Sequence, residues 1–122
     1  MATINKYGIT FHSDFKLLFP RFSAITLFGH VFMRRSFKEM EQYLDTYRGK
    51  VMANHEKIHM LQASTFKTRY FGFYMYYIGY WIKNLFTKGF NMNAYYNIPF
   101  EKEAYQNETN FGYNEIVWEN YK

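Results

Sequence analysis

The chain has 122 residues and a mass of 14.9 kDa, the size of one ordinary domain, so we expect a single domain over residues 1–122. Hydrophobic residues make up 48% of it and aromatic residues 24%, which excludes general disorder. There is no cysteine, so disulfides and thiolate metal sites are excluded. Any zinc ion would need histidine and carboxylate ligands.

The formal net charge is +5, but the basic residues are scattered and form one tight pair, Arg34 and Arg35. A nucleic-acid partner usually requires a concentrated basic face, so we expect none. The positive charge would suit an anionic membrane surface or acidic peptides. The first six residues lack the apolar core of a signal peptide, so we expect a cytoplasmic protein, with membrane-surface contact left open.

The first part of the chain has the residue types of strands. Residues 1–21 are expected to form an irregular lead-in with one short strand, which ends at Pro20. Residues 22–28 and 31–33 are rich in strand-forming side chains and are separated by Gly29 and His30. They predict either a tight hairpin or one long strand with a bulge at Gly29.

Helices are expected to follow. Ser36 and Glu39 match a capping box, so a helix should begin at Phe37 and end near Gly49. Two further helices are expected over residues 51–63 and 66–86. Asn97 and Pro99 predict the start of a last helix over residues 100–108, and residues 109–122 should be part helix and part coil. The fold class is therefore α+β, a small N-terminal sheet or hairpin packed on three or four helices.

One segment of the second helix has the pattern HExxH. His55 and His59 are four residues apart, so their rings project from one face of a helix and can share one ion. Glu56 lies beside that face, where its carboxylate could take a proton from the zinc-bound water that attacks a peptide carbonyl. The pattern predicts a zinc peptidase that lacks one ligand.

The missing ligand is expected from the last helix. The other histidines, His12 and His30, precede the motif, and no glycine and third histidine follow His59, which excludes the metzincin class. Glu101 and Glu103 are about 200° apart around a helix, so only one of them can face the metal. Geometry leaves the choice open.

Two segments together resemble a known family. NHEKIHMLQ, which ends at Gln62, is followed by an aromatic helix and by FEKEAY, which ends at Tyr105. They resemble minimal gluzincin-like zinc metallopeptidases, including a small uncharacterised bacterial family with an HExxHxxQ helix and an FExEAY-like segment. The resemblance covers roughly residues 22–108.

The resemblance implies roles for individual residues. Gluzincins such as the CAAX-prenyl proteases often have an FExxAD-like segment, whose glutamate binds zinc and whose aspartate orients a histidine. The match implies Glu101 as the zinc ligand and puts Tyr105 where the aspartate would be, with Glu108 as a candidate substitute. Gln62 lies on the metal face and could hydrogen-bond near the site. The region of residues 22–33 would supply an edge strand that binds the substrate backbone.

Three classes of function are consistent with these residues. The first is a zinc-dependent metallopeptidase with His55, His59 and Glu101 as ligands and Glu56 as general base, acting on a peptide or protein substrate. The second is a zincin-like binding module without turnover. The third is an interfacial membrane protein whose HExxH arose by chance, because the uncharged aromatic run of residues 70–82 is too short to span a bilayer but suits its interface. A central core helix is the favoured interpretation of that run.

Overall fold

The computed structural model describes residues 2–16, 24–27 and 29–122. They group into two compact units, Met1–Lys57 and Ile58–Lys122, and each is described by itself. The expectation of one domain stays a prediction. The α+β class is confirmed, with four strands and five α-helices in the described residues.

The first unit contains a four-stranded sheet in the order β1-β2-β4-β3. Strands β1 (Thr3–Lys6) and β2 (Ile9–His12) form an antiparallel hairpin. The two turn residues, Tyr7 and Gly8, have positive φ angles of 58° and 77°, as tight hairpin turns require. The sequence analysis expected one strand in residues 1–21, whereas the structure has two, because β1 is mostly polar and each strand is only four residues long.

Strands β3 (Ala24–Leu27) and β4 (His30–Met33) are antiparallel neighbours. Of the two arrangements expected here, the structure has the hairpin, with Gly29 at a φ of 83°. Pro20, at which the lead-in was expected to end, lies outside the described residues. Because β4 also pairs with β2, in parallel, β3 is the end strand of the sheet among the described residues.

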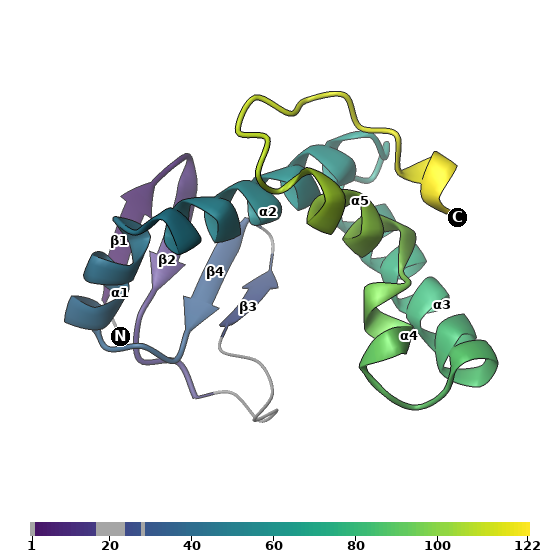
Figure 1. The fold of residues 1–122 in the computed structure, drawn as a ribbon, viewed down its shortest axis with the longest axis horizontal. Helices are drawn as coiled ribbons and strands as arrows, with labels where there is room; N and C mark the ends of the chain where they lie inside the picture. Colours follow the sequence, from purple (N-terminus) through teal and green to yellow (C-terminus); the bar gives the residue numbers. More distant parts are fainter. Residues whose placement is uncertain (1, 17–23, 28) are drawn as a thin grey trace. The chain divides into compact units, whose positions relative to one another are not determined.

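One face of the sheet is buried beneath helices. Helix α1 (Phe37–Leu44) and the first half of α2 (Tyr47–Ser64) lie across this face (Figure 1). Alternate residues of β2 and β4 point inward, as strand geometry requires. The buried apolar side chains of this layer are Ile9, Phe11, Val31, Met33, Met40, Leu44 and Ala53.

The boundary between α1 and α2 differs from the prediction. Ser36 caps α1 as expected, accepting a 3.3 Å hydrogen bond from the Glu39 amide, but the helix ends at Leu44 rather than near Gly49. Gly49 lies inside the first turn of α2. A Cβ atom there would be 2.0 Å from the Tyr43 carbonyl oxygen, so this glycine permits a close approach of backbones rather than a left-handed helix end.

The second unit is helical, with α3 (Tyr70–Lys88), α4 (Met92–Tyr96), α5 (Pro99–Asn107) and a 3₁₀ turn, η1 (Trp118–Tyr121). Helix α4 was not predicted, and Asn97 ends it rather than capping α5, whose N-cap is Ile98. The core of this unit consists of Ala63, Phe73, Ile98, Phe100 and Trp118.

Helix α3 was expected to be a central core helix, and it is buried along one side. Phe73 packs in the core, and Asn84 donates a 3.1 Å hydrogen bond to the Ala94 carbonyl. The opposite side of α3 is exposed. In the described part of the chain, every helix is too short or too polar to cross a membrane.

Candidate metal centre

Helix α2 carries both histidines of the HExxH segment. At its start the Thr46 hydroxyl accepts a 3.1 Å hydrogen bond from the Gly49 amide, and at its end the Thr65 hydroxyl donates to the Gln62 carbonyl. These contacts satisfy backbone groups that have no partner within the helix. The helix is therefore longer than the predicted range of 51–63 and holds His55 and His59 one turn apart.

Helix α5 carries the candidate carboxylates. Pro99 occupies its first turn, where a missing amide proton costs nothing. The adjacent Phe100 is fully buried, with ring centroids 4.7 Å from those of both Phe73 and Trp118. The packing of Phe100 fixes the position of the start of α5. The next residue, Glu101, is therefore held in the interior, with 3% of its surface exposed.

The structure brings His55, His59 and Glu101 together. All three are buried, and one possible ligand atom from each lies within 4.8 Å of the others. His59 Nε2 is 2.9 Å from Glu101 Oε1, and the Tyr77 hydroxyl donates a 2.6 Å hydrogen bond to Glu101 Oε2. Two imidazoles and a carboxylate are the protein ligands of many catalytic zinc sites, which leave the fourth position for water.

The proton position on His59 follows from the contacts of Gln62. The Gln62 amide nitrogen donates to the Phe100 carbonyl at 3.0 Å and to Glu103 Oε1 at 2.8 Å. Both partners are acceptors, so the amide oxygen must be the atom that faces His59 Nδ1, at 2.8 Å. Because that oxygen can only accept, His59 carries a proton on Nδ1.

This arrangement has a consequence at the other ring nitrogen. In a neutral His59 protonated at Nδ1, Nε2 presents a lone pair to Glu101 Oε1 at 2.9 Å. Two acceptors at this distance in a buried site repel each other unless a proton or a metal cation lies between them. A shared proton or a bound cation would satisfy this contact, and the donor set of two imidazoles and one carboxylate fits zinc.

Glu103 has different surroundings. It is fully buried and accepts hydrogen bonds from the Gln62 amide nitrogen, the Tyr113 hydroxyl at 2.7 Å and the Val117 amide at 2.5 Å. These donors belong to α2 and to the C-terminal segment. Of the two carboxylates that helical geometry left open, Glu101 is the one beside His59, and Glu103 ties Gln62 to the C-terminal segment.

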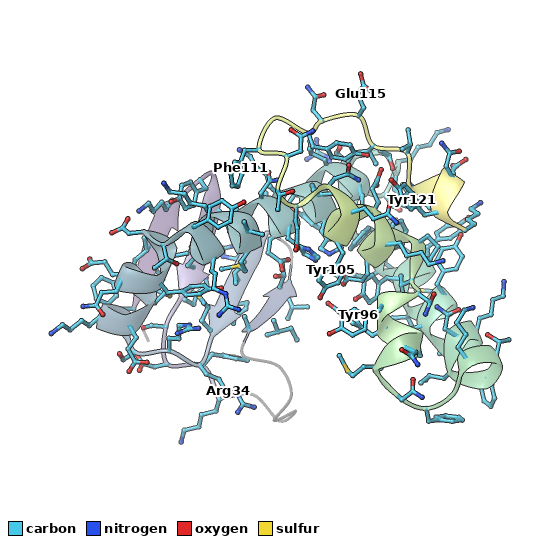
Figure 2. The ribbon with its side chains drawn as sticks, viewed as in Figure 1. Arg34, Tyr96, Tyr105, Phe111, Glu115 and Tyr121 are labelled. Atoms are coloured by element: carbon cyan, nitrogen blue, oxygen red, sulfur yellow. The ribbon has the colours of Figure 1, made fainter. Side chains whose placement is uncertain are left out.

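Glu56 and Tyr105, two further predicted site residues, lie on the two helices that carry the cluster. Glu56 directly follows His55 and is partly exposed. Tyr105 is one helical turn beyond Glu101, and its ring packs edge-on against Tyr96, with centroids 5.3 Å apart (Figure 2). Burial, and next the nearby Glu101 charge, raise the pKa of Tyr105 to about 12, so its hydroxyl stays protonated at neutral pH. The suggested role of Glu108 stays a prediction.

Two contributors escaped the sequence analysis. Tyr77 bonds Glu101 from α3, but with thirteen tyrosines in the chain the sequence alone could not select one. Glu103 was considered only as a rival ligand. Its spacing of two residues from Glu101 did indicate that it faces elsewhere, but the donors that it meets, Tyr113 and Val117, come from a segment without a recognisable pattern.

Comparisons with protein-family models, with curated protein sequences and with solved structures gave no match to this chain. The gluzincin-like resemblance therefore stays a prediction that rests on the residues themselves.

Proposed function

We propose that this protein is a zinc-dependent peptidase of gluzincin type, with His55, His59 and Glu101 as the zinc ligands. The observation that carries the proposal is the buried contact of His59 Nε2 with Glu101 Oε1 at 2.9 Å. Gln62 holds the proton of His59 on Nδ1, so Nε2 is available as a metal ligand. A chance HExxH on a surface helix would not require such an arrangement.

Each residue around the ion has a separate task in this proposal. Bound zinc would supply Lewis acidity, polarising a substrate carbonyl and acidifying a coordinated water. Glu56 accepts the proton of the attacking water and passes it to the leaving amine. Tyr77 donates a 2.6 Å hydrogen bond to Glu101 Oε2. This contact orients the carboxylate so that its other oxygen, Oε1, faces His59.

We infer the substrate class from the side chains of strand β3, on the proposal that an extended peptide binds along this strand. Its exposed side chains Ile25 and Leu27 would favour apolar residues in that peptide. We therefore expect extended, apolar stretches of polypeptide to be cleaved in preference to folded ones.

Activity is tested with the zinc-loaded protein and a library of quenched fluorescent peptides. We expect hydrolysis by the parent and a decrease of about 10²–10⁴-fold in Glu56→Gln, the loss typical of a missing general base. The variant should keep its zinc, which shows that the loss is chemical. Hydrolysis that survives Glu56→Gln unchanged would come from a contaminant and would count against the proposal.

A second candidate is zinc binding without turnover. It is favoured by Tyr105, which stands where the FExxAD-like segment of the gluzincins has an aspartate and which packs against Tyr96. Stoichiometric zinc in a parent protein that cleaves no peptide of the library would select this alternative. The ligands would be the same in both cases.

A further inference from the structure

The exposed side of α3 carries a continuous apolar stripe. Five side chains of this helix are large, apolar and between 48% and 77% exposed: Phe71, Met75, Ile78, Ile82 and Phe86. At about 100° per residue they fall within an arc of about 80°. Phe90, 75% exposed, extends the stripe beyond the helix and packs against Phe86. We call these six residues the α3 stripe.

Positive charges surround the α3 stripe. Lys83 and Lys88 are exposed and lie on opposite sides of it, each about 100–120° from its centre around the helix. Lys67 and Arg69, also exposed, precede the first turn. No acidic residue occurs in the sequence between Glu56 and Glu101, so the whole region has one sign of charge.

Amphipathic aromatic residues occupy the borders of the stripe. Trp81 and Tyr76 are 41% and 52% exposed and lie about 100–120° from its centre, on opposite sides. Trp and Tyr favour positions where an apolar layer meets water, because each has an apolar ring and a polar group. Lysines beside such a layer extend their ammonium groups toward the headgroups.

We propose that the α3 stripe binds the surface of an anionic lipid bilayer, with α3 lying in the plane of the interface. An apolar arc with basic residues on both sides is the pattern of interfacial helices. A second copy of the chain is the other apolar partner available, but pairing two such faces would bring two uniformly basic regions together. The inference does not depend on zinc binding.

The test uses the full chain and sedimentation with phosphatidylcholine vesicles, with and without phosphatidylglycerol. We expect binding to be strongest on the anionic vesicles and to weaken as salt is added. Phe71→Ser/Phe86→Ser should weaken binding about tenfold or more, since two exposed rings no longer enter the bilayer. Lys83→Gln/Lys88→Gln should weaken it about fivefold per lysine, on the anionic vesicles only.

Phe111→Ser is the matched control, because Phe111 is a similarly exposed ring outside α3. It should bind vesicles like the parent, and circular dichroism should show that all variants are folded. Equal binding by the parent and Phe71→Ser/Phe86→Ser, or no binding to anionic vesicles, would overturn the proposal. A parent dimer that this variant dissociates, without vesicle binding, would assign the stripe to a second copy.

Discussion

Gln62 donates a 2.8 Å hydrogen bond to Glu103, while its amide oxygen lies 2.8 Å from His59 Nδ1. Glu103 lies apart from the candidate metal ligands, but it orients the Gln62 amide. That amide in turn orients His59, which is one of the ligands. The two glutamates of α5 thereby have different tasks. Glu101 faces the histidines directly, and Glu103 acts on His59 through Gln62.

The first prediction concerns Gln62. Gln62→Met keeps the side-chain volume but loses the acceptor for His59 Nδ1, so zinc affinity should fall about 10–100-fold. The free energy of unfolding should also fall by about 1–3 kcal/mol, because Glu103 and the Phe100 carbonyl lose a donor. Competition with a chelating dye measures the affinity, and urea titration measures the stability.

A double variant separates hydrogen bonding from packing at this position. In Gln62→Glu/Glu103→Gln a carboxylate accepts from His59 and from the amide at position 103, so these two hydrogen bonds are kept and only the Phe100 carbonyl loses its donor. We expect it to recover part of the lost zinc affinity, whereas Gln62→Glu alone places two buried carboxylates together and should be the least stable. Unchanged affinity in Gln62→Met would refute the positioning role.

The second prediction separates the two carboxylates of α5. Glu101→Gln should abolish stoichiometric zinc binding, because a neutral amide is a poor ligand for the cation. Glu103→Gln should retain zinc but lower the free energy of unfolding by about 1–3 kcal/mol, since one of its buried donors loses an acceptor. Elemental analysis and thermal unfolding of both proteins check this, and the reverse assignment of zinc loss would show that Glu103 is the ligand.

The third prediction concerns two helical glycines. Gly49→Ala would place a Cβ 2.0 Å from the Tyr43 carbonyl oxygen, so it should destabilise the chain by about 1–3 kcal/mol or more. Gly79→Ala meets nothing within 4 Å and should stabilise α3 by up to about 1 kcal/mol. Thermal unfolding compares the two. Equal effects would show that α1 and α2 are not as close as described.

The sequence predicted the fold class and the pairing of His55 with His59 from local spacing, whereas Glu101 was predicted from the resemblance of the FEKEAY segment. Residues four apart on a helix share a face wherever the helix lies, so His55 and His59 could be paired directly. The helix boundary near Gly49 was wrong because glycine serves a left-handed turn and a close backbone approach equally well. The bond from Tyr77 to Glu101 and the donors around Glu103 depend on how separate elements pack, which no local pattern indicates.

The fourth prediction concerns alkaline pH. Burial, and next the hydrogen bond that it donates to Glu103, raise the pKa of Tyr113 above its ordinary value. Above a pH of about 10 the unfolded chain loses this proton while the folded chain keeps it, so the free energy of unfolding should fall as pH rises. In Tyr113→Phe the fall between pH 9 and 11, measured by urea titration, should be smaller. An equal fall would show that Tyr113 titrates normally.

The central claim is that His55, His59 and Glu101 hold one zinc ion, and metal content tests it most directly. The protein is purified without chelator and analysed for bound elements beside Glu56→Gln and His59→Ala, with circular dichroism to show that each is folded. We expect about one equivalent of zinc in the parent and in Glu56→Gln, and none in His59→Ala. A folded parent that binds no metal even after zinc is added would contradict the account.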